Sequence, residues 1–293
     1  MAYNNTYTHG QLWAQARAAG RDLQARLEPL LETSRFGRSI ASYVEIGSTN
    51  AVAIEWAAEG AAEGALVIAD HQTDGRGRLG RTWQDVSGKN LMFSIVLRPT
   101  LRPEDMGLIM LAAAVAVSHA LERAAENHSV RIKWPNDVLL NGRKCCGMLM
   151  ESTSSGAGAD RPRAAVVGIG VNVNQASFPD GFAYEPTSLA LETGQLYHRT
   201  PILGAILNGF ERNYDGLARD GGASLRDAYR ARMKGIGDEV TVYPATAGTA
   251  IRGVIRGIAD NGALMIETLQ GMQALSSGDV TFRRAEIEDA SGD

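Results

Sequence analysis

The chain has 293 residues, of which 44% are hydrophobic and 21% are charged, as in an ordinary globular protein with a sizeable core. At this length, one large domain and a smaller one are expected. The formal net charge of −4 argues against a nucleic-acid-binding protein, because such domains are usually basic. Any cationic site must therefore be local.

Cysteine usage and hydropathy point to the cytoplasm. Cys145 and Cys146 are adjacent, which excludes a disulfide framework and a spaced zinc site, and we expect two buried thiols. His119, Glu122 and Arg123 interrupt the most apolar stretch before it reaches the ~18 residues of a membrane span. The first residues lack the layout of a secretion signal. We predict a cytoplasmic protein that does not act at a membrane.

Hydrophobic periodicity and turn residues predict an α+β domain with a mixed sheet and flanking helices. The expected helices cover residues 12–32, 48–60, 104–126, 200–219 and 224–233. The expected strands cover residues 42–46, 65–70, 91–99, 130–134, 137–152 and 164–174, with a hairpin turn at Asn141-Gly142. Ser48 or Thr49 is expected to cap the second helix, and Thr200-Pro201 to open the fourth. Residues 155–163 read as a surface turn.

After Gly237 the pattern changes to short alternating strands with turn signals such as Asn261-Gly262. This predicts a small all-β barrel or sandwich. No repeat of 20–50 residues is visible, which argues against a solenoid or propeller. We divide the chain into a helical extension (1–40), a main domain (41–235), a small β domain (236–286) and a tail (287–293).

Gly75, Gly77 and Gly80 have the spacing G-x-G-x-x-G of a dinucleotide-binding loop. An apolar run does precede this loop. However, residues 81–90 carry no apolar stripe, include Gly88 and lead into a strand, whereas the dinucleotide loop must open a helix. We therefore reject the dinucleotide interpretation.

Arg76, Arg78 and Arg81 instead suggest that the loop holds an anion, because each guanidinium offers a planar fork to phosphate or carboxylate. The alternative is a solvated basic surface loop. Trp83 in the same loop favours a site, because exposed tryptophan is uncommon. Glycines allow such a loop to move between an open and a closed form.

Lys133 ends an expected strand directly before Trp134-Pro135, and Asn136 and Asp137 are turn formers. This fixes the ammonium group at a strand end, where loops build sites. Taken alone, it could equally be a surface lysine.

Four segments read together resemble the biotin protein ligase family, also called biotin–[acetyl-CoA-carboxylase] ligases. They are GSTN at 47–50, HQTDGRGRLGRTW at 71–83, KWPNDVLLNGRKCCGMLME at 133–151 and GIGVNVN at 168–174. The resemblance covers roughly residues 42–285. It implies a catalytic domain related in fold to class II aminoacyl-tRNA synthetases and lipoate ligases, followed by an SH3-like β-barrel. The Cys145-Cys146 pair departs from the family's commoner small apolar residues, which should alter packing more than chemistry.

The resemblance also implies a reaction and its participants. Biotin and MgATP give biotinyl-5′-AMP and pyrophosphate, and biotin is then transferred to a lysine of a biotin carboxyl carrier protein or domain. ATP and Mg²⁺ are the implied cofactors; the sequence does not identify a metal-binding residue.

The residues implied by the resemblance fall into three groups. Lys133 and Arg78 are the expected catalytic residues. The expected biotin contacts are Ser48, Thr49, Asn50, Gln72, Gly75, Arg76, Gly77, Arg78, Lys133 and Gly147. The expected nucleotide contacts are Arg78, Arg81, Trp83, Asn90, Asn136, Lys144 and Asn172.

The residue types suit this chemistry. Biotin's carboxylate and the α-phosphate of ATP repel each other, and fixed cations such as Lys133, Arg78 and Arg81 remove that barrier. No general base is needed, because the carboxylate is already ionised near neutral pH. The mixed anhydride is prone to hydrolysis, so we expect loop 73–90, with Trp83, to close over it.

The N-terminal segment gives no sign of a repressor. Family members that are also repressors carry an N-terminal winged helix, and residues 1–40 show no helix-turn-helix pattern, so we expect a monofunctional ligase that does not bind DNA.

Two alternative activities remain at this stage. Lipoate ligation is the nearest rival, and a non-enzymatic biotin-binding regulator is the second. Residues 1–40 could cap the domain or form a homodimer element, with packing favoured.

Overall fold

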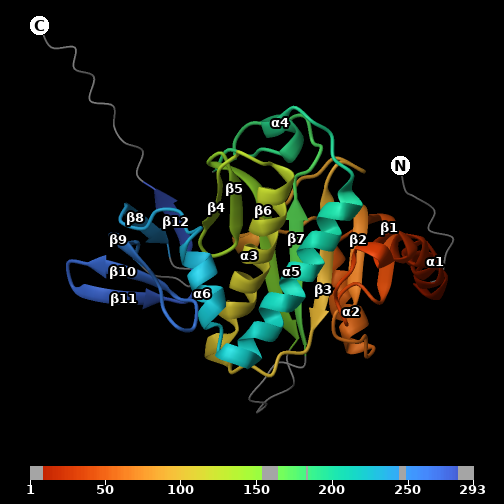
Figure 1. Ribbon diagram of the computed structural model, residues 1–293, viewed down its shortest axis with the longest axis horizontal. Helices are drawn as coiled ribbons and strands as arrows, with labels where there is room; N and C mark the ends of the chain where they lie inside the picture. The colour runs from red at the N-terminus through yellow and green to blue at the C-terminus, as the bar shows by residue number, and fades with distance from the viewer. Residues whose placement is uncertain (1–8, 154–163, 183, 244–248, 283–293) are drawn as a thin grey trace, which may run out of the picture.

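Two β-sheets organise the chain in the computed structural model, which describes residues 9–153, 164–182, 184–243 and 249–282. The larger sheet has seven strands in the order β1-β2-β3-β7-β6-β5-β4, and the smaller has five in the order β11-β10-β9-β8-β12. Figure 1 shows the large sheet at the centre, with helices packed against it and the small sheet beside β4.

The large sheet is mixed, as the sequence predicts. Its strands are β1 (Ile40–Ile46), β2 (Leu66–Gln72), β3 (Leu91–Leu97), β4 (Val130–Lys133), β5 (Asp137–Leu140), β6 (Arg143–Thr153) and β7 (Ala164–Val171). Only the β1–β2 pair is parallel, and the other described pairs are antiparallel. The β5–β6 turn is the expected one, with Asn141 and Gly142 both at positive φ.

Side chains alternate between the two faces of this sheet, as they must in a pleated strand. One face contributes Phe93, Ile95 and Val167 to the main hydrophobic core. The other contributes Val96 and Val166 to a smaller second core. This alternation decides which residues of β3, β6 and β7 can reach the cavity described below.

The main core is covered by α3 (Gly107–Ala124), α5 (Arg199–Asp220) and α6 (Ala223–Arg230). Residues 103–124, which include the short turn η3 (Pro103–Asp105), are long and apolar enough to cross a membrane. The expectation that His119, Glu122 and Arg123 exclude a membrane span is therefore wrong on length and composition alone. However, 72% of its most apolar window is buried inside the protein, which is typical of the core helix that Figure 1 shows in front of the sheet.

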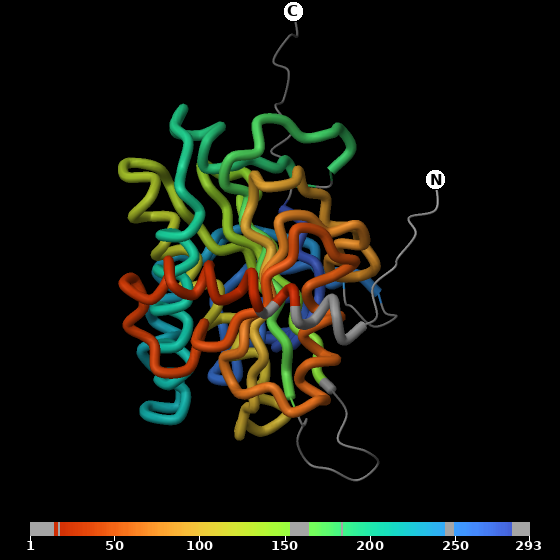
Figure 2. Tube along the Cα trace, turned by 90° about the vertical axis from the view of Figure 1, so that its right-hand side faces the viewer, coloured from red at the N-terminus to blue at the C-terminus, as the bar shows by residue number. Residues whose placement is uncertain are grey.

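The opposite face is covered by α2 (Thr49–Ala58), whose Ala53, Trp56 and Ala57 lie in the second core. At the outer edge, α1 (His9–Leu27) packs beside β1, as Figures 1 and 2 both show. The approach is close, because a Cβ added to Gly20 would lie 2.1 Å from the carbonyl oxygen of Ile40. The helical extension thus caps the sheet edge, and its part in a homodimer stays a prediction.

Helix ends differ from expectation in three places. Ser48 occupies the N-cap position of α2 with extended backbone, but neither it nor Thr49 makes a side-chain cap bond. Helix α5 begins one residue before Thr200, with His198 at the N-cap position, so the expected cap-then-proline start is wrong. The N-terminal helix ends at Leu27 and continues as the turn η1 (Glu28–Leu30), because Pro29 lacks the backbone donor that an α-helix needs.

The sequence missed the short helix α4 (Leu189–Thr193). Ser188 caps it, its hydroxyl accepting a hydrogen bond from the backbone N–H of Leu191 at 3.1 Å. At one and a half turns, this helix is too short for apolar periodicity to show. The turn predicted at 155–163 lies outside the described residues.

The C-terminal sheet contains β8 (Glu239–Tyr243), β9 (Ile251–Ile258), β10 (Leu264–Thr268), β11 (Gly271–Leu275) and β12 (Asp279–Phe282), all antiparallel. Val240, Val242, Ile255 and Ile266 are buried in it. The Asn261-Gly262 turn joins β9 to β10 as expected, with Gly262 at φ +84°. Strands β11 and β12 are the two edge strands of this sheet. They do not pair with each other within the described residues 249–282, so the sheet is not closed into a barrel there.

The two sheets meet along β4 and α6. The indole N–H of Trp134 donates to the carbonyl of Gly262 at 3.1 Å, and Arg230 donates to the carbonyl of Ile258 at 2.9 Å. Lys133, at the end of β4, lies 3.4 Å from a carboxylate oxygen of Asp279 at the start of β12. The last contact brings the C-terminal sheet to the end of the strand that carries a predicted site residue.

Candidate active site

A cavity of about 490 Å³, including its open mouth, lies on the α2 face of the large sheet. Its floor exists because β6 and β7 carry glycine where the pleat would otherwise place side chains: Gly147 faces Gly170, and Leu149 faces Gly168. The lining residues are Ser48, Thr49, Asn50, Gln72, Arg76, Gly77, Arg78, Trp83, Asn136, Lys144, Gly147, Met148, Leu149, Gly168, Ile169 and Gly170. Apolar strands with a few polar groups form the kind of lining that binds a small molecule.

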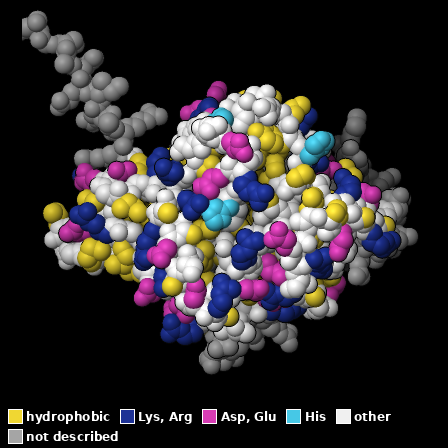
Figure 3. Space-filling model, in the orientation of Figure 1, with side chains coloured by type: hydrophobic (Ala, Val, Ile, Leu, Met, Phe, Trp, Pro, Cys, Tyr) yellow, Lys and Arg dark blue, Asp and Glu magenta, His cyan; other side chains and the backbone are white. Residues whose placement is uncertain are grey.

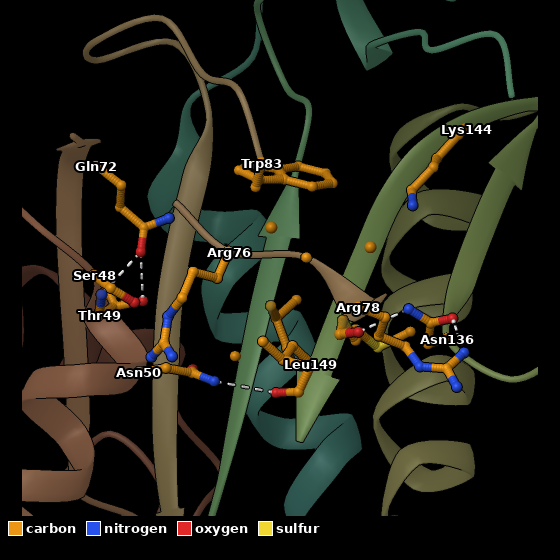
Figure 4. Close-up of a pocket in the computed structure, with 16 residues that line it drawn as sticks. Ser48, Thr49, Asn50, Gln72, Arg76, Arg78, Trp83, Asn136, Lys144 and Leu149 are labelled. Atoms are coloured by element: carbon orange, nitrogen blue, oxygen red, sulfur yellow. Dashed lines mark hydrogen bonds between the residues drawn. The ribbon is translucent and has the colours of Figure 1, made fainter. Parts of the chain in front are cut away.

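One end of the cavity is a neutral hydrogen-bonded network. The backbone N–H and hydroxyl of Thr49 both contact Oε1 of Gln72, at 2.8 and 3.0 Å, and the Thr49 and Ser94 hydroxyl oxygens lie 2.8 Å apart. Because a backbone N–H can only donate, the oxygen of the Gln72 amide must face Thr49. The Gln72 amino group therefore points away from Thr49, as Figure 4 shows, and can donate to a ligand.

Asn50 lies at the same end, but its carboxamide is used by the protein. It donates to Oε2 of Glu151 at 2.7 Å and accepts from the Ser94 hydroxyl at 2.6 Å. It also fills the space above Gly168, where an added Cβ would lie 2.2 Å from its oxygen. Asn50 therefore shapes the cavity and positions Glu151.

The glycine–arginine loop between β2 and β3 is an irregular hairpin. An antiparallel bridge joins Arg76 to Thr82, and the Trp83 N–H donates to the Gly75 carbonyl at 2.8 Å. Gly75 permits this approach, because an added Cβ would lie 2.5 Å from the Trp83 oxygen. A short turn, η2 (Arg78–Gly80), follows, and the chain then enters β3. No α-helix follows the glycines, which confirms that this is not a dinucleotide-binding loop.

Trp83 reaches from this loop across the cavity, over the glycines of β6 and β7 (Figure 4). A Cβ added to Gly170 would lie 2.6 Å from the indole, and one added to Gly147 would lie 2.8 Å from it. The indole Nε1 is buried and has no hydrogen-bond partner among the described residues. A donor in this position is expected to find a partner, which a ligand entering the cavity can supply.

Among the described residues, three cations line the cavity, and two of them, Lys144 and Arg76, are paired with carboxylates. Lys144, on β6, places its ammonium 2.7 Å from a carboxylate oxygen of the buried Asp137 and 5.8 Å from the centre of the indole ring. Arg76 forms a two-pronged pair with Glu151, at 3.2 and 3.3 Å. Both positive charges are therefore balanced by carboxylates in the structure.

Arg78 is the most desolvated cation of the loop. Its guanidinium donates to the side-chain oxygen of Asn136 at 3.1 Å and to the carbonyl of Gly278 at 3.2 Å. Burial lowers the pKa of Arg78 from its ordinary value, although the charges of Asp137 and Asp279 partly offset this. The side chain stays charged near neutral pH, because the ordinary pKa of arginine lies far above neutrality.

Sequence comparisons agree with this arrangement. The profile of the Biotin/lipoate A/B protein ligase family matches residues 44–172, and that of the biotin protein ligase C terminal domain matches residues 235–283. The biotin–[acetyl-CoA-carboxylase] ligase of Paracoccus denitrificans is 37% identical over 241 residues, covering 80% of this chain and 97% of that protein. The chain belongs to the biotin protein ligase family.

Other members of the family extend the comparison. The bifunctional ligase/repressor BirA of Bacillus subtilis is 36% identical over 252 residues, which cover 85% of this chain and 76% of that protein. Among solved structures, the biotin protein ligase from Aquifex aeolicus in complex with biotin and ATP superposes with a TM-score of 0.70 at 29% identity. The match covers 85% of this chain and all of that one. The fold of this biotin protein ligase family member is thus established over both sheets.

Most of the predicted contacts meet in the cavity, but Gly75, Arg81 and Lys133 are not among its lining residues. Lys133 is buried at the end of β4, 3.4 Å from Asp279 and 5.5 Å from the ring centre of Tyr184. Arg81 is exposed and forms an ion pair with the same Asp279. Lys144, rather than Lys133, is the ammonium group that lines the cavity.

Two predicted nucleotide contacts, Asn90 and Asn172, lie outside the cavity lining. Asn90 is fully buried; it accepts from the Val173 N–H at 3.0 Å and donates to Gln175 at 2.5 Å. Asn172 is buried as well and donates to the Thr187 carbonyl at 2.9 Å. The buried Oδ1 of Asn172 has no hydrogen-bond partner among the described residues. The nucleotide contacts of both residues stay predictions.

Several functional residues were not found from the sequence. Leu149, Gly168, Ile169 and Gly170 line the cavity, and the alternating glycines of GIGV were the available signal. Glu151 and Asp279, which balance the cations, carried no signal, because their partners are 75 and 198 residues away. Cys145 and Cys146 are buried in β6 as expected, and burial raises the pKa of the Cys145 thiol to about 12.

Proposed function

We propose that this chain is an ATP-dependent biotin protein ligase. It forms biotinyl-5′-AMP and pyrophosphate from biotin and MgATP, and then transfers the biotinyl group to a lysine of a biotin carboxyl carrier protein or domain. One observation carries the proposal: a single cavity has a neutral polar end at Gln72 and a cationic end at Lys144 and Arg78. This matches a ligand with a polar ring at one end and a carboxylate at the other.

The neutral end suits the ureido ring of biotin. The Gln72 amino group is a donor for the ureido oxygen, and Ser48 lines the cavity beside it. The ring sulfur and the valeryl chain need apolar walls, which the Leu149 side chain and the bare backbone of Gly168 and Gly170 provide.

The cationic end suits the first step. The carboxylate oxygen attacks the α-phosphorus of ATP, a new O–P bond forms, and pyrophosphate leaves with the electrons of the broken P–O bond. Lys144 can neutralise the carboxylate and the α-phosphate together, because it lies on the cavity wall between Trp83 and Asp137. We assign this role to Lys144 on its position, and a phosphate-side role to Lys133, Arg78 and Arg81.

We propose that the Mg²⁺ of the reaction enters the site bound to the phosphates of ATP. No group of three or more His, Cys, Asp or Glu that could hold a metal occurs within the described ranges 9–153, 164–182, 184–243 and 249–282. Mg²⁺ commonly binds through substrate phosphates with few protein ligands. When bound, it would shield phosphate charge, while the residues named above orient the two substrates.

In the second step, the amino group of the carrier lysine attacks the carbonyl carbon of the mixed anhydride. An amide bond forms, AMP leaves as the phosphate-bearing group, and the amine loses a proton. The hairpin of residues 75–83, with Trp83 across the cavity, is placed to limit water access until the carrier arrives.

The test is direct. The purified protein is mixed with biotin, MgATP and an apo biotin-carrier domain, and the carrier is weighed by mass spectrometry. We expect the mass of one biotinyl group to be added, and none when the carrier's acceptor lysine is replaced by alanine. A parallel reaction with lipoate and a lipoyl domain tests the nearest rival. Transfer of lipoate but not biotin would overturn the proposal, and transfer of neither would favour a biotin-binding regulator.

A further inference from the structure

The C-terminal sheet contributes a carboxylate to the cation cluster of the catalytic domain. Asp279 is the first residue of β12, and its two carboxylate oxygens face different partners: one lies 3.4 Å from the Lys133 ammonium, and the other accepts a hydrogen bond from Arg81. The preceding residue, Gly278, accepts from Arg78 through its carbonyl oxygen at 3.2 Å. Two consecutive residues thus contact three cations.

These cations outnumber the carboxylate that faces them. Lys234 lies in the same cluster, with its ammonium 2.6 Å from the Tyr184 hydroxyl and 5.3 Å from the centre of the same ring that Lys133 approaches. Burial alone would raise the pKa of the Asp279 carboxyl. The hydrogen bond from Arg81 and the charge of Lys133 outweigh it and hold that pKa below its ordinary value. Asp279 is therefore ionised near neutral pH and acts as an anion among cations.

The strand that carries Asp279 lies at the edge of its sheet. Strand β12 has four residues and pairs only with β8, in a register that runs from Asp279–Tyr243 to Phe282–Val240. Its other anchors are Val280, which is buried in the main core, and the Phe282 ring, which lies 4.9 Å from the Lys234 ammonium. Asp279 precedes both anchors, and the ends of edge strands open at lower free energy than their buried centres. The start of β12 can therefore withdraw without disturbing the large sheet.

We propose that Asp279 is a positioning residue that occupies Arg81 and Lys133 in place of nucleotide phosphates, so that a polyphosphate must displace the start of β12 to bind. The proposal rests on the proposed function, since it deepens the role of the cationic end. A carboxylate and a phosphate compete for the same guanidinium and ammonium donors. The C-terminal domain thereby lowers the affinity for free polyphosphate.

The test uses the whole protein and the isosteric change Asp279→Asn, with inorganic pyrophosphate as the probe in isothermal titration calorimetry. We expect pyrophosphate to bind roughly five- to tenfold more tightly, the scale expected for loss of one partly exposed competing charge. Biotin affinity should stay unchanged. Asp279→Glu should restore the wild-type value, because it restores the carboxylate.

Glu267→Gln is the matched control. Glu267 is a carboxylate of the same sheet that pairs with an arginine, Arg256, away from the cavity. Its loss should leave both affinities unchanged. In steady-state assays, Asp279→Asn should lower KM for ATP and leave KM for biotin unaltered, a split that general destabilisation does not produce. Unchanged or weaker pyrophosphate binding in a folded Asp279→Asn protein overturns the proposal.

A second measurement needs no variant. Hydrogen–deuterium exchange of wild-type residues 278–282 should increase on addition of pyrophosphate, because the phosphates release β12. Slower exchange there would contradict the proposal, since it would show the strand closing on the ligand. These results are separable from the proposed function. A protein that biotinylates the carrier, yet binds pyrophosphate equally with and without the Asp279 carboxylate, refutes only the displacement.

Discussion

The two ends of the cavity are built differently. At the Gln72 end, neutral groups close on one another through short contacts from β2, β3 and α2, and Thr49, Asn50 and Ser94 are buried. At the Lys144 end, cations are balanced by carboxylates: Asp137 pairs with Lys144, and the distant Asp279 pairs with Arg81. Figure 3, which shows the opposite face of the molecule with α3 and α5 in front, has basic and acidic side chains interspersed in a similar way.

The Gln72 end is therefore preformed for a ligand, whereas the cations at the Lys144 end must exchange their protein partners for those of a ligand. Neutral hydrogen-bonding groups with fixed partners can present one donor to a ligand without rearrangement. Cations paired with protein carboxylates must exchange partners when a substrate anion arrives, because an uncompensated charge in a partly buried site is unfavourable. Biotin binding should therefore depend on geometry, and nucleotide binding on charge and ionic strength.

The largest expected effect separates two lysines at the cationic end. Lys144→Ala should lower biotin-dependent ATP–pyrophosphate exchange by about 10²–10³-fold, the usual loss for a donor to developing charge. Lys133→Ala should lower it by roughly tenfold, because Lys133 lies outside the cavity lining. The exchange rate at saturating biotin is the measurement. Equal losses, or a larger one for Lys133, would restore the role that the sequence first gave to Lys133.

The Lys144 result needs a control for stability, because the change leaves the buried Asp137 carboxylate without its cation. The double change Lys144→Ala and Asp137→Asn removes that buried charge. It should recover the melting temperature and leave exchange at the level of the single variant. Recovery of exchange in the double variant would mean that Lys144 acts only through folding.

The next effect tests the neutral end. Gln72→Glu keeps an oxygen for the Thr49 N–H but replaces the donating amino group by an acceptor. Biotin affinity should fall by about 10- to 100-fold, in line with one unsatisfied polar group of ~1–3 kcal/mol. Pyrophosphate affinity should not change. Calorimetry with both ligands measures this, and a parallel loss of both affinities would break the distinction between the two ends.

A smaller effect is expected at Gly170, which lies under the Trp83 indole between the two ends of the cavity. Gly170→Ala should lower the free energy of unfolding by about 1–3 kcal/mol, because the added Cβ would lie 2.6 Å from the indole. In a Trp83→Ala background the same change should be nearly neutral. Denaturant unfolding of the four proteins of this cycle is the measurement. Gly47→Ala is the control, since an added Cβ there meets nothing within 4 Å.

The smallest effect is expected for Glu151→Gln. Its partner Arg76 is partly exposed, so loss of the pair should change stability by less than about 1 kcal/mol. Freeing Arg76 should nevertheless change the salt dependence of substrate-anion binding, because one carboxylate no longer competes for it. Titrations at two salt concentrations measure this. An unaltered salt dependence would show that the Arg76–Glu151 pair does not exchange partners.

The sequence predicted the neutral end well because its residues lie in two short motifs. Residues 48–50 begin a helix, and Gln72 ends a strand that pairs with the neighbouring β1, so local pattern and adjacency determine their contacts. The seven strands of the large sheet were also recognisable from apolar runs and from the Asn141-Gly142 turn.

The cationic end could be predicted only in part. The arginines of the loop were visible, but which cation lines the cavity depends on the β5–β6 register, which shifts between Val138 and Leu139. Asn90 and Asn172 were expected as nucleotide contacts from the resemblance to the family, and this expectation stays a prediction. Their long-range contacts with Gln175 and Thr187 could not be read from the motifs.

The most direct test is a crystal structure of this protein with biotin and a non-hydrolysable ATP analogue. We expect the ureido oxygen within hydrogen-bond distance of the Gln72 amino group and the carboxylate between the Lys144 ammonium and the α-phosphate. The remaining phosphates should replace Asp279 at Arg81. Biotin bound with its carboxylate at Gln72, or phosphates bound away from Lys144 and Arg78, would contradict the account.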